Sequence, residues 1–301
     1  MTTACLTRTG SPFDLDDGAA YRQWRDAKLA RQPRRVEDLI VDVADPRRLQ
    51  PRERDALLER CRDANMAVYR SPQTGADKEL PRLLAAQLGL RRLDANWLAD
   101  EDGISQIAVR DGSAGSAADF IPYTERAIQW HTDGYYHPQQ RRIRAMVLHC
   151  VRAAAEGGAN ALMDHELAYI SLRDADPGHV RALMAGDAMT IPARMGEAGI
   201  ARPAQAGPVF AVDAADGALH MRYTARTRSI EWKADRSTGA AVAFLRQLLA
   251  SADAPRFTLR LEPGMGIVCN NVLHDRSAFE DDPLRPRLLY RARFLDRVAT
   301  F

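Results

Sequence analysis

From Ile121 onward the sequence is divided by glycine, proline and asparagine into short apolar or alternating stretches. Residues 145–151 (AMVLHCV) are almost continuously apolar, and residues 256–261 (RFTLRL) alternate between polar and apolar side chains. Both patterns predict β-strands, because successive side chains of a strand point to opposite faces. Helical spacing is found mainly earlier, as over residues 51–65. The sequence therefore predicts a mainly β fold with flanking helices, a β-sandwich or jelly roll.

Two stretches stand apart from this pattern of strands. The first 35 residues are polar and rich in arginine, and we interpret them as a loose arm with a helix near residues 19–32. The stretch from about 175 to 235 is rich in loop-forming residues and is interpreted as a lid or insertion. The total of 301 residues fits one large domain or two small ones.

Charge and composition exclude several classes of protein. The 42 basic and 40 acidic side chains leave a formal net charge of +2, which gives no electrostatic case for a nucleic-acid partner. No stretch of 18 apolar residues predicts a transmembrane helix, and the N-terminus does not resemble a signal peptide. The four cysteines form no CxxC pair, so we expect free thiols and a cytoplasmic location. The oligomeric state is left open, a homo-oligomer included.

The first candidate site is the string QWHTDG, which contains His131 and Asp133. In a strand these two residues would point to the same face and present an imidazole beside a carboxylate. A second imidazole would complete a 2-His-1-carboxylate face, which binds Fe(II) and leaves further coordination positions open. A His-x-Asp pair also arises by chance, and the alternative is a hydrogen-bonded pair on a surface turn.

The second candidate is His274, within the string NNVLHDRSAF. It follows a Pro-Gly turn and a short apolar stretch, so it would sit just past a strand, where a rigid scaffold can aim a ligand inward. The alternative is a histidine that caps a turn or a helix.

The third candidate is the final strand, RPRLLYRARF. Alternation places Arg287, Leu289, Arg291 and Arg293 on one face, while the other face carries Leu, Tyr, Ala and Phe side chains that suit packing. The arginine face must then meet water or anions, and a guanidinium matches a carboxylate with two parallel hydrogen bonds. The alternative is a solvated edge strand.

These three pieces, in this order, resemble the taurine/2-oxoglutarate dioxygenase (TauD/TfdA) family. His274 follows the His131-x-Asp133 pair by about 140 residues, and Arg287 and Arg291 follow on the last strand. The NNVLHDRSAF string is similar to the clavaminate-synthase-like branch, although a glycine more often stands where this chain has Asp275. The resemblance covers most of the chain, and it is loosest over the first 35 residues and the stretch 175–235.

The resemblance implies a single domain over residues 1–301 with a double-stranded β-helix core, a distorted jelly roll of cupin type. It implies that Fe(II) is held by three residues, namely His131, Asp133 and His274. The co-substrate 2-oxoglutarate would chelate the iron and pair its far carboxylate with Arg287, helped by Arg291. Asn160 stands near the position where the family usually has a threonine on this carboxylate. O₂ would react with an unidentified small molecule, hydroxylating it while 2-oxoglutarate is decarboxylated to succinate.

Several alternatives stay open. The same site could desaturate or cyclise its substrate, a zinc-dependent hydrolase could use the same ligands, and a non-catalytic jelly-roll protein could merely bind through them. No histidine precedes His131, so the sulfonate-binding histidine of the taurine enzyme is not carried over. Other polar residues could line the pocket, although packing, capping or solvation is the simpler interpretation of each. They are Ser105, Gln106, Tyr135, Tyr136, His137, His149, His165, Arg222, Arg226 and Arg228.

Overall fold

The computed structural model describes residues 10–94, 102–110, 120–196, 199–228 and 230–298. The chain divides into two compact units. We call one the helical unit, which consists of Met1–Gln32, Trp130–Arg142 and Met163–Pro255. The other, the sheet unit, consists of Pro33–Gln129, Ile143–Leu162 and Arg256–Phe301. The expectation of a single domain over residues 1–301 stays a prediction.

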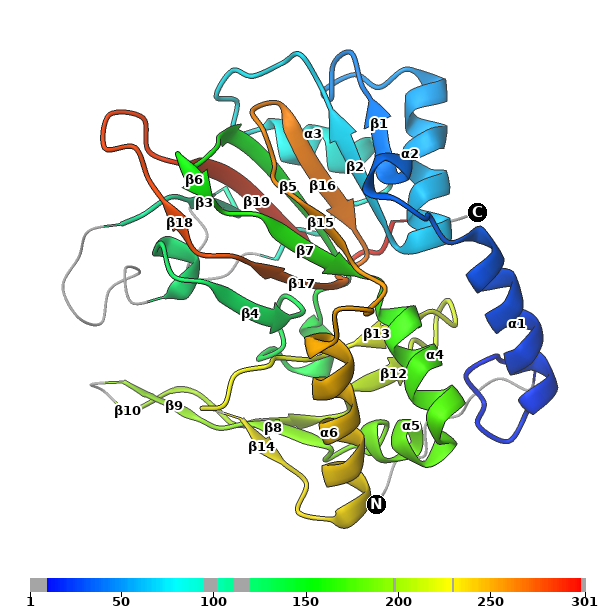
Figure 1. The fold of residues 1–301 in the computed structure, drawn as a ribbon. Coiled ribbons are helices and arrows are strands. Elements are labelled where there is room, and N and C mark those ends of the chain that lie inside the picture. The colour runs from blue at the N-terminus through cyan, green and yellow to red at the C-terminus, as the bar shows by residue number, and fades with distance from the viewer. Residues whose placement is uncertain (1–9, 95–101, 111–119, 197–198, 229, 299–301) are drawn as a thin grey trace. The chain divides into compact units, whose positions relative to one another are not determined.

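Two sheets dominate the sheet unit (Figure 1). The six-stranded sheet has the order β1 (Ile40–Asp42), β2 (Met66–Arg70), β16 (Met265–Cys269), β5 (Ala145–Arg152), β19 (Leu288–Phe294) and β3 (Ile104–Ile107). The four-stranded sheet has the order β15 (Phe257–Leu259), β7 (Asn160–Met163), β17 (Leu273–Arg276) and β4 (Ile128–His131). Only β1 and β2 pair in parallel within the described six-stranded sheet. A further pair joins β6 (Glu156–Gly157) to β18 (Phe279–Glu280).

Alternation along the strands divides the apolar side chains between two cores. Leu162 and Leu259 of the four-stranded sheet share one core with residues of the six-stranded sheet such as Cys150 and Leu289. The side chains that alternate with these along the six-stranded sheet, such as Tyr290, point to the opposite face of that sheet. There they pack against two helices. The helices are α2 (Pro51–Ala64) and α3 (Leu80–Gln87). The mainly β fold with flanking helices is confirmed, although the sheets formed by the described residues do not close into a barrel.

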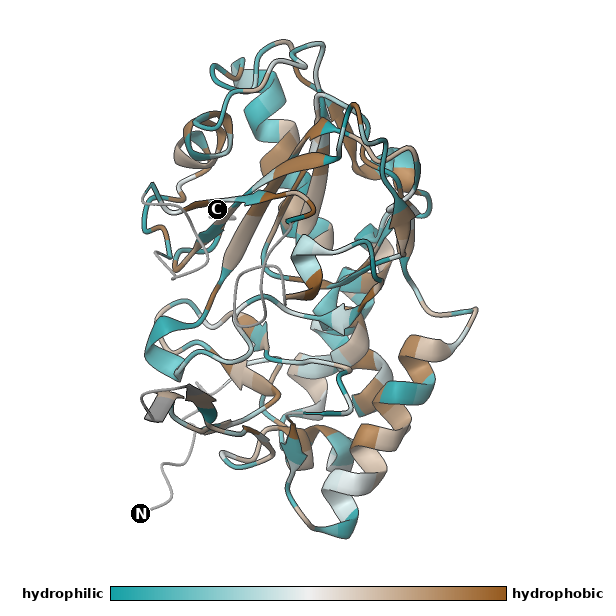
Figure 2. Ribbon diagram, turned by 90° about the vertical axis from the view of Figure 1, so that its left-hand side faces the viewer, coloured by the Kyte–Doolittle hydropathy of each residue, from teal (hydrophilic) through white to brown (hydrophobic). Residues whose placement is uncertain are grey.

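Helix α2 illustrates how local sequence signals predict a helix. Pro51 opens the helix, and Gln50 and Glu53 form a capping box that satisfies its first N–H groups. Leu57 and Cys61, four residues apart, are fully buried on one face. In Figure 2 helices carry hydrophobic residues in bands between hydrophilic ones, as expected where one face is buried. No helix among the described residues is long and apolar enough to cross a membrane.

The helical unit contains α1 (Gly18–Arg31), α4 (His165–Ala175), α5 (Pro177–Leu183) and α6 (Arg236–Ala250). Its strands form small sheets, with β8 (Met189–Ile191) between β11 (Gln205–Gly207) and β14 (Glu231–Trp232). Two hairpins join β9 (Arg194–Gly196) to β10 (Gly199–Arg202) and β12 (Phe210–Val212) to β13 (Leu219–Met221). The described residues of the stretch 175–235 therefore form helices and strands, and its role as a lid stays a prediction.

The expectation of a loose N-terminal arm is wrong for its described part. Arg173 of α4 donates hydrogen bonds to the main-chain oxygens of Pro12 and Asp14, at 2.7 and 2.8 Å. The ammonium of Lys28 lies 2.6 Å from a carboxylate oxygen of Asp164 and 2.6 Å from one of Glu166. Charged side chains usually predict a solvated surface, but these are buried. Their contacts hold the described part of the arm against α4.

The cysteines behave as the sequence predicts. Cys61, Cys150 and Cys269 are buried free thiols, and Cys5 lies outside the described residues. Burial in apolar surroundings raises the pKa of Cys150 to about 12, so this thiol stays protonated and unreactive at neutral pH.

Candidate metal centre

His131 is the last residue of β4, and a second segment holds the chain there. The main-chain N–H of Thr132 donates to the oxygen of Tyr223 at 3.0 Å, and the N–H of Tyr223 donates back to Oγ1 of Thr132 at 3.1 Å. His131 itself forms an antiparallel bridge with Thr224. These contacts with residues 223 and 224 keep the backbone extended through His131. They support the expectation that His131 and Asp133, two residues apart, point to the same face.

Asp133 follows immediately, where the chain turns. Gly134 has a φ of +68°, a conformation that residues with a side chain rarely adopt, and the N–H of His137 closes the turn on the oxygen of Gly134 at 2.8 Å. Asp133 is buried, with only 6% of its surface exposed. A carboxylate held at such a turn is fixed in position, as a metal ligand must be.

His274 lies in β17, which neighbours β4 in the four-stranded sheet. Its Nδ1 lies 2.9 Å from the main-chain oxygen of Val272. A carbonyl oxygen can only accept, so Nδ1 carries the proton and the neutral ring offers the lone pair of Nε2. This is the tautomer and the supporting hydrogen bond that metal-ligating histidines ordinarily have.

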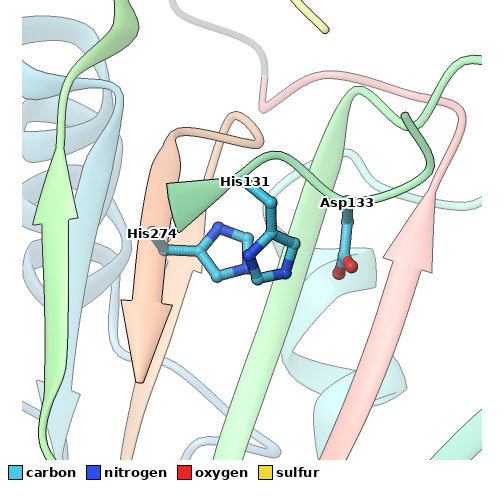
Figure 3. Close-up of side chains that lie close together, drawn as sticks. All are labelled: His131, Asp133 and His274. Carbon is cyan, nitrogen blue, oxygen red and sulfur yellow. The ribbon is translucent and has the colours of Figure 1, made fainter. Parts of the chain in front are cut away.

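The three predicted ligands come together. Each of His131, Asp133 and His274 offers one ligand atom, and these atoms all lie within 4.8 Å of one another. Figure 3 shows the two imidazole rings side by side and the carboxylate next to them. Two imidazoles and one carboxylate fit Fe(II) and leave coordination positions open. The donor set alone would also suit zinc.

Arg287 immediately precedes β19 and is 5% exposed. Its guanidinium carbon lies 4.9 Å from the centroid of the Phe279 ring. Among the described residues its guanidinium forms no ion pair, although Asp281 accepts a hydrogen bond from its main-chain N–H at 2.6 Å. Burial lowers the pKa of Arg287 to about 10, so it stays charged at neutral pH. A buried cation in this state is suited to an anionic ligand.

Arg291 and Asn160 lie on the two different sheets. Arg291 is half-buried in β19, opposite Ser105 of β3. Asn160 begins β7, and its Nδ2 donates to the main-chain oxygen of Asp275 at 2.9 Å. The Asp275 carboxylate accepts from the N–H of Ala161 at 2.9 Å, which gives a structural task to the residue that replaces the more usual glycine. The roles expected for Arg291 and Asn160 at 2-oxoglutarate stay predictions.

A pocket beside Asp133 contains residues that the sequence analysis missed. Within the described part of the chain, its wall includes Asp133, His137, Arg142, Gly207, His220 and Arg222. Arg142 and His220 were not singled out, because no motif or local spacing marks them. Arg222 was named as a residue that could line the pocket or be solvated; it lines the pocket, and the solvated alternative is wrong because the side chain is buried.

Arg222 is 8% exposed and donates to main-chain oxygens. Its Nε reaches Tyr135 at 2.7 Å, its Nη1 reaches Met189 at 2.9 Å, and its Nη2 reaches Gln205 at 2.7 Å. The guanidinium therefore joins the turn after Asp133 to β8 and β11. Arg226, by contrast, is exposed, and its Nη1 donates to the Tyr135 hydroxyl at 3.2 Å.

Two other histidines are held by structural hydrogen bonds, and the capping position expected of His165 is taken by Asp164. His149 is fully buried in β5, with Nδ1 2.8 Å from the Tyr69 hydroxyl. The Nε2 of His165 lies 3.0 Å from the oxygen of Leu219, while Asp164 caps α4.

A family comparison decides between the metal chemistries. Residues 30–293 match the model described as "Taurine catabolism dioxygenase TauD, TfdA family". The chain belongs to this family. TauD/TfdA membership confirms the resemblance drawn from His131, Asp133, His274 and Arg287, and it favours iron over the zinc alternative.

Two similar proteins carry a more specific name. A uridine-5'-phosphate dioxygenase from Amycolatopsis sp is 36% identical over 177 residues, which cover 56% of this chain and 60% of that protein. A uridine-5'-phosphate dioxygenase from Streptomyces sp is 32% identical over 198 residues, which cover 64% of this chain and 69% of that protein. The chain thus spans about three fifths of the length of the first relative.

Solved structures agree with the fold of the family. Asparagine oxygenase in complex with Fe(II), 2S,3S-3-hydroxyasparagine and succinate has a TM-score of 0.58 and 17% identity, covering 93% of this chain and 85% of that one. The non-heme iron oxygenase OrfP in complex with Fe and alpha-ketoglutaric acid has a TM-score of 0.55 and 17% identity, covering 81% and 82%. At these identities the likeness concerns the fold.

Proposed function

We propose that this TauD/TfdA member is an Fe(II)- and 2-oxoglutarate-dependent dioxygenase. It would hydroxylate a small molecule with O₂ while 2-oxoglutarate is decarboxylated to succinate. The observation that carries the proposal is the convergence of His131, Asp133 and His274, with ligand atoms within 4.8 Å of one another. The finer description of the fold as a double-stranded β-helix belongs to the same proposal, and the shared core of the two sheets supports it.

The side chains would divide the work as follows. His131, Asp133 and His274 hold the iron, which when bound supplies the oxidising chemistry with O₂ and 2-oxoglutarate. The Nδ1–H of His274, bonded to Val272, keeps Nε2 unprotonated for the metal. Arg287 binds the far carboxylate of 2-oxoglutarate through charge-assisted hydrogen bonds, with Arg291 and Asn160 as helpers. A carboxylate among the ligands also partly neutralises the metal charge.

We further propose a nucleoside monophosphate as the substrate, with uridine-5'-phosphate as the first candidate. The names of the two bacterial relatives support this choice. A phosphate monoester carries close to two negative charges at neutral pH, so a substrate of this class requires cationic residues near the metal.

The test is a screen for substrate-stimulated succinate formation with Fe(II), 2-oxoglutarate and O₂. Uridine-5'-phosphate, uridine, asparagine and taurine are offered separately, and the expected result is stimulation by uridine-5'-phosphate. A product with one additional oxygen atom identifies hydroxylation, whereas a product with two fewer hydrogens indicates desaturation or ring closure. Turnover that needs zinc but not 2-oxoglutarate would contradict the oxygenase and favour a hydrolase.

The metal assignment has a separate test without turnover. Under anaerobic conditions, Fe(II) and 2-oxoglutarate together should give a weak visible charge-transfer band. His131→Ala and Asp133→Ala should each abolish the band. His179→Ala is the matched control, because His179 lies on α5 and is not part of the ligand cluster. An unchanged band in His131→Ala would contradict the assignment.

A further inference from the structure

The pocket beside Asp133 has an unbalanced set of charges. Of the residues that line it within the described chain, Arg142, Arg222, His137 and His220 carry basic groups, and Asp133 alone is acidic. Asp133 is itself the proposed metal ligand, so its charge would be directed at the metal. Apart from Asp133, the guanidinium and imidazole groups of the wall come from two arginines and two histidines, and the other described lining residues are neutral.

Arg222 contributes charge to this wall but is not arranged as a ligand. Its Nε, Nη1 and Nη2 donate to four main-chain oxygens, those of Tyr135, Met189, Gly207 and Gln205. Burial lowers the pKa of Arg222 to about 10, so it still carries its proton at neutral pH. Carbonyl dipoles stabilise this guanidinium without cancelling its net charge, so Arg222 raises the electrostatic potential of the pocket, which favours an anion.

Arg142 is the residue best placed to contact that anion. It follows the short helical turn η4 (Gln139–Arg141), and its Nε donates to the main-chain oxygen of Gln139 at 3.1 Å. This bond engages Nε of the guanidinium, and Arg142 lines the pocket. His137 and His220 are half-buried in the same wall, and each imidazole can donate a hydrogen bond.

We propose that this pocket is the phosphate subsite of the enzyme, in which Arg142 binds the phosphate of the substrate with help from His137 and His220. This inference rests on the proposed function, because it assumes a phosphorylated substrate oxidised at the neighbouring metal. A phosphate monoester accepts several charge-assisted hydrogen bonds, and a guanidinium offers a matching pair of donors. The subsite would also fix which end of the substrate lies beside Asp133.

The experiment measures binding without turnover. The anaerobic enzyme, loaded with Fe(II) and 2-oxoglutarate, is titrated with uridine-5'-phosphate, uridine or inorganic phosphate in a calorimeter. The wild type should bind uridine-5'-phosphate at least about tenfold more tightly than uridine, as expected for charge-assisted hydrogen bonds to phosphate. Competition by inorganic phosphate shows whether the phosphate group alone occupies the pocket.

The variants are Arg142→Gln and His220→Gln, with Arg141→Gln as the matched control. Arg141 precedes Arg142 and is exposed, but it does not line the pocket. Arg142→Gln should weaken uridine-5'-phosphate binding about tenfold to a hundredfold and leave uridine binding within about twofold. Arg141→Gln should change neither. His220→Gln tests the subsite independently if Arg142→Gln does not fold.

The outcomes separate the subsite from the proposed function. If the wild type binds 2-oxoglutarate with Fe(II) but binds uridine-5'-phosphate no better than uridine, the subsite is wrong and the oxygenase stands. Equal weakening of both ligands by Arg142→Gln, or an equal effect of Arg141→Gln, also overturns the subsite. Failure of the wild type to bind 2-oxoglutarate contradicts the proposed function itself.

Discussion

The guanidinium carbon of Arg287 lies 4.9 Å from the centroid of the Phe279 ring. Arg276 approaches the same ring, at 4.7 Å, but its guanidinium also donates to the main-chain oxygens of Pro122 and Thr124. The two arginines therefore differ in function: Arg276 ties loops together, while Arg287 has its ring contact and no ion pair among the described residues. This difference supports Arg287 as the residue that receives 2-oxoglutarate.

Arg287→Gln should raise the dissociation constant for 2-oxoglutarate about tenfold to a hundredfold, because a charge-assisted pair with a carboxylate is lost. The charge-transfer band, followed during a 2-oxoglutarate titration, measures the change. Arg285→Gln is the control, since Arg285 is exposed two residues earlier. A normal affinity in Arg287→Gln together with a weakened one in Arg291→Gln would transfer the role to Arg291.

Gly266→Ala should destabilise the protein by about 1–3 kcal/mol, the usual cost of overpacking a core. Gly266 of β16 lies between Tyr69 and His149 in the sheet register. A methyl group there would overlap the Tyr69 ring, which occupies the space that glycine leaves and reaches Nδ1 of His149. Urea unfolding measures the free energy of unfolding.

Gly239→Ala is the matched control for this substitution. Gly239 is exposed within α6, and an added methyl group would meet nothing within 4 Å. Alanine favours helix over glycine by about 0.8–1 kcal/mol, so this variant should be more stable than the wild type. Equal destabilisation by both substitutions would contradict the packing argument at Gly266.

The mainly β fold and the pairing of the candidate ligands His131 and Asp133 could be predicted from the sequence because these signals are local. The almost continuous apolar run over residues 145–151 predicts a strand, and the spacing of His131 and Asp133 predicts two ligands at one strand end. Arg222 could not be read in this way, since its partners are main-chain oxygens up to 87 residues distant. Every residue carries a main-chain oxygen, so the amino-acid sequence does not indicate which of these oxygens will accept a hydrogen bond.

The buried histidine predicts a pH dependence of stability. Burial of His149 lowers its pKa to about 4, below the ordinary value of 6.5. As the pH falls below about 6.5, His149 becomes protonated in the unfolded chain but stays neutral in the folded protein. The free energy of unfolding therefore falls until the pH approaches 4. From pH 7 to pH 5 this contribution is about 2 kcal/mol. His149→Gln should lack it, and identical pH dependence of urea unfolding in both proteins would disprove the assignment.

The arm itself gives the last prediction, because Lys28 is 2% exposed and lies between the carboxylates of Asp164 and Glu166. Lys28→Met leaves two carboxylates near each other without their cation, which should destabilise the protein by about 3–5 kcal/mol. Lys233→Met removes an exposed ion pair with Asp187 and should cost less than about 1 kcal/mol. Urea unfolding compares the two variants. Removing Lys28 leaves desolvated carboxylates, whereas removing Lys233 leaves a hydrated one, so the two free-energy costs should differ. Equal costs would mean that the arm detaches in solution and that Lys28 is hydrated there.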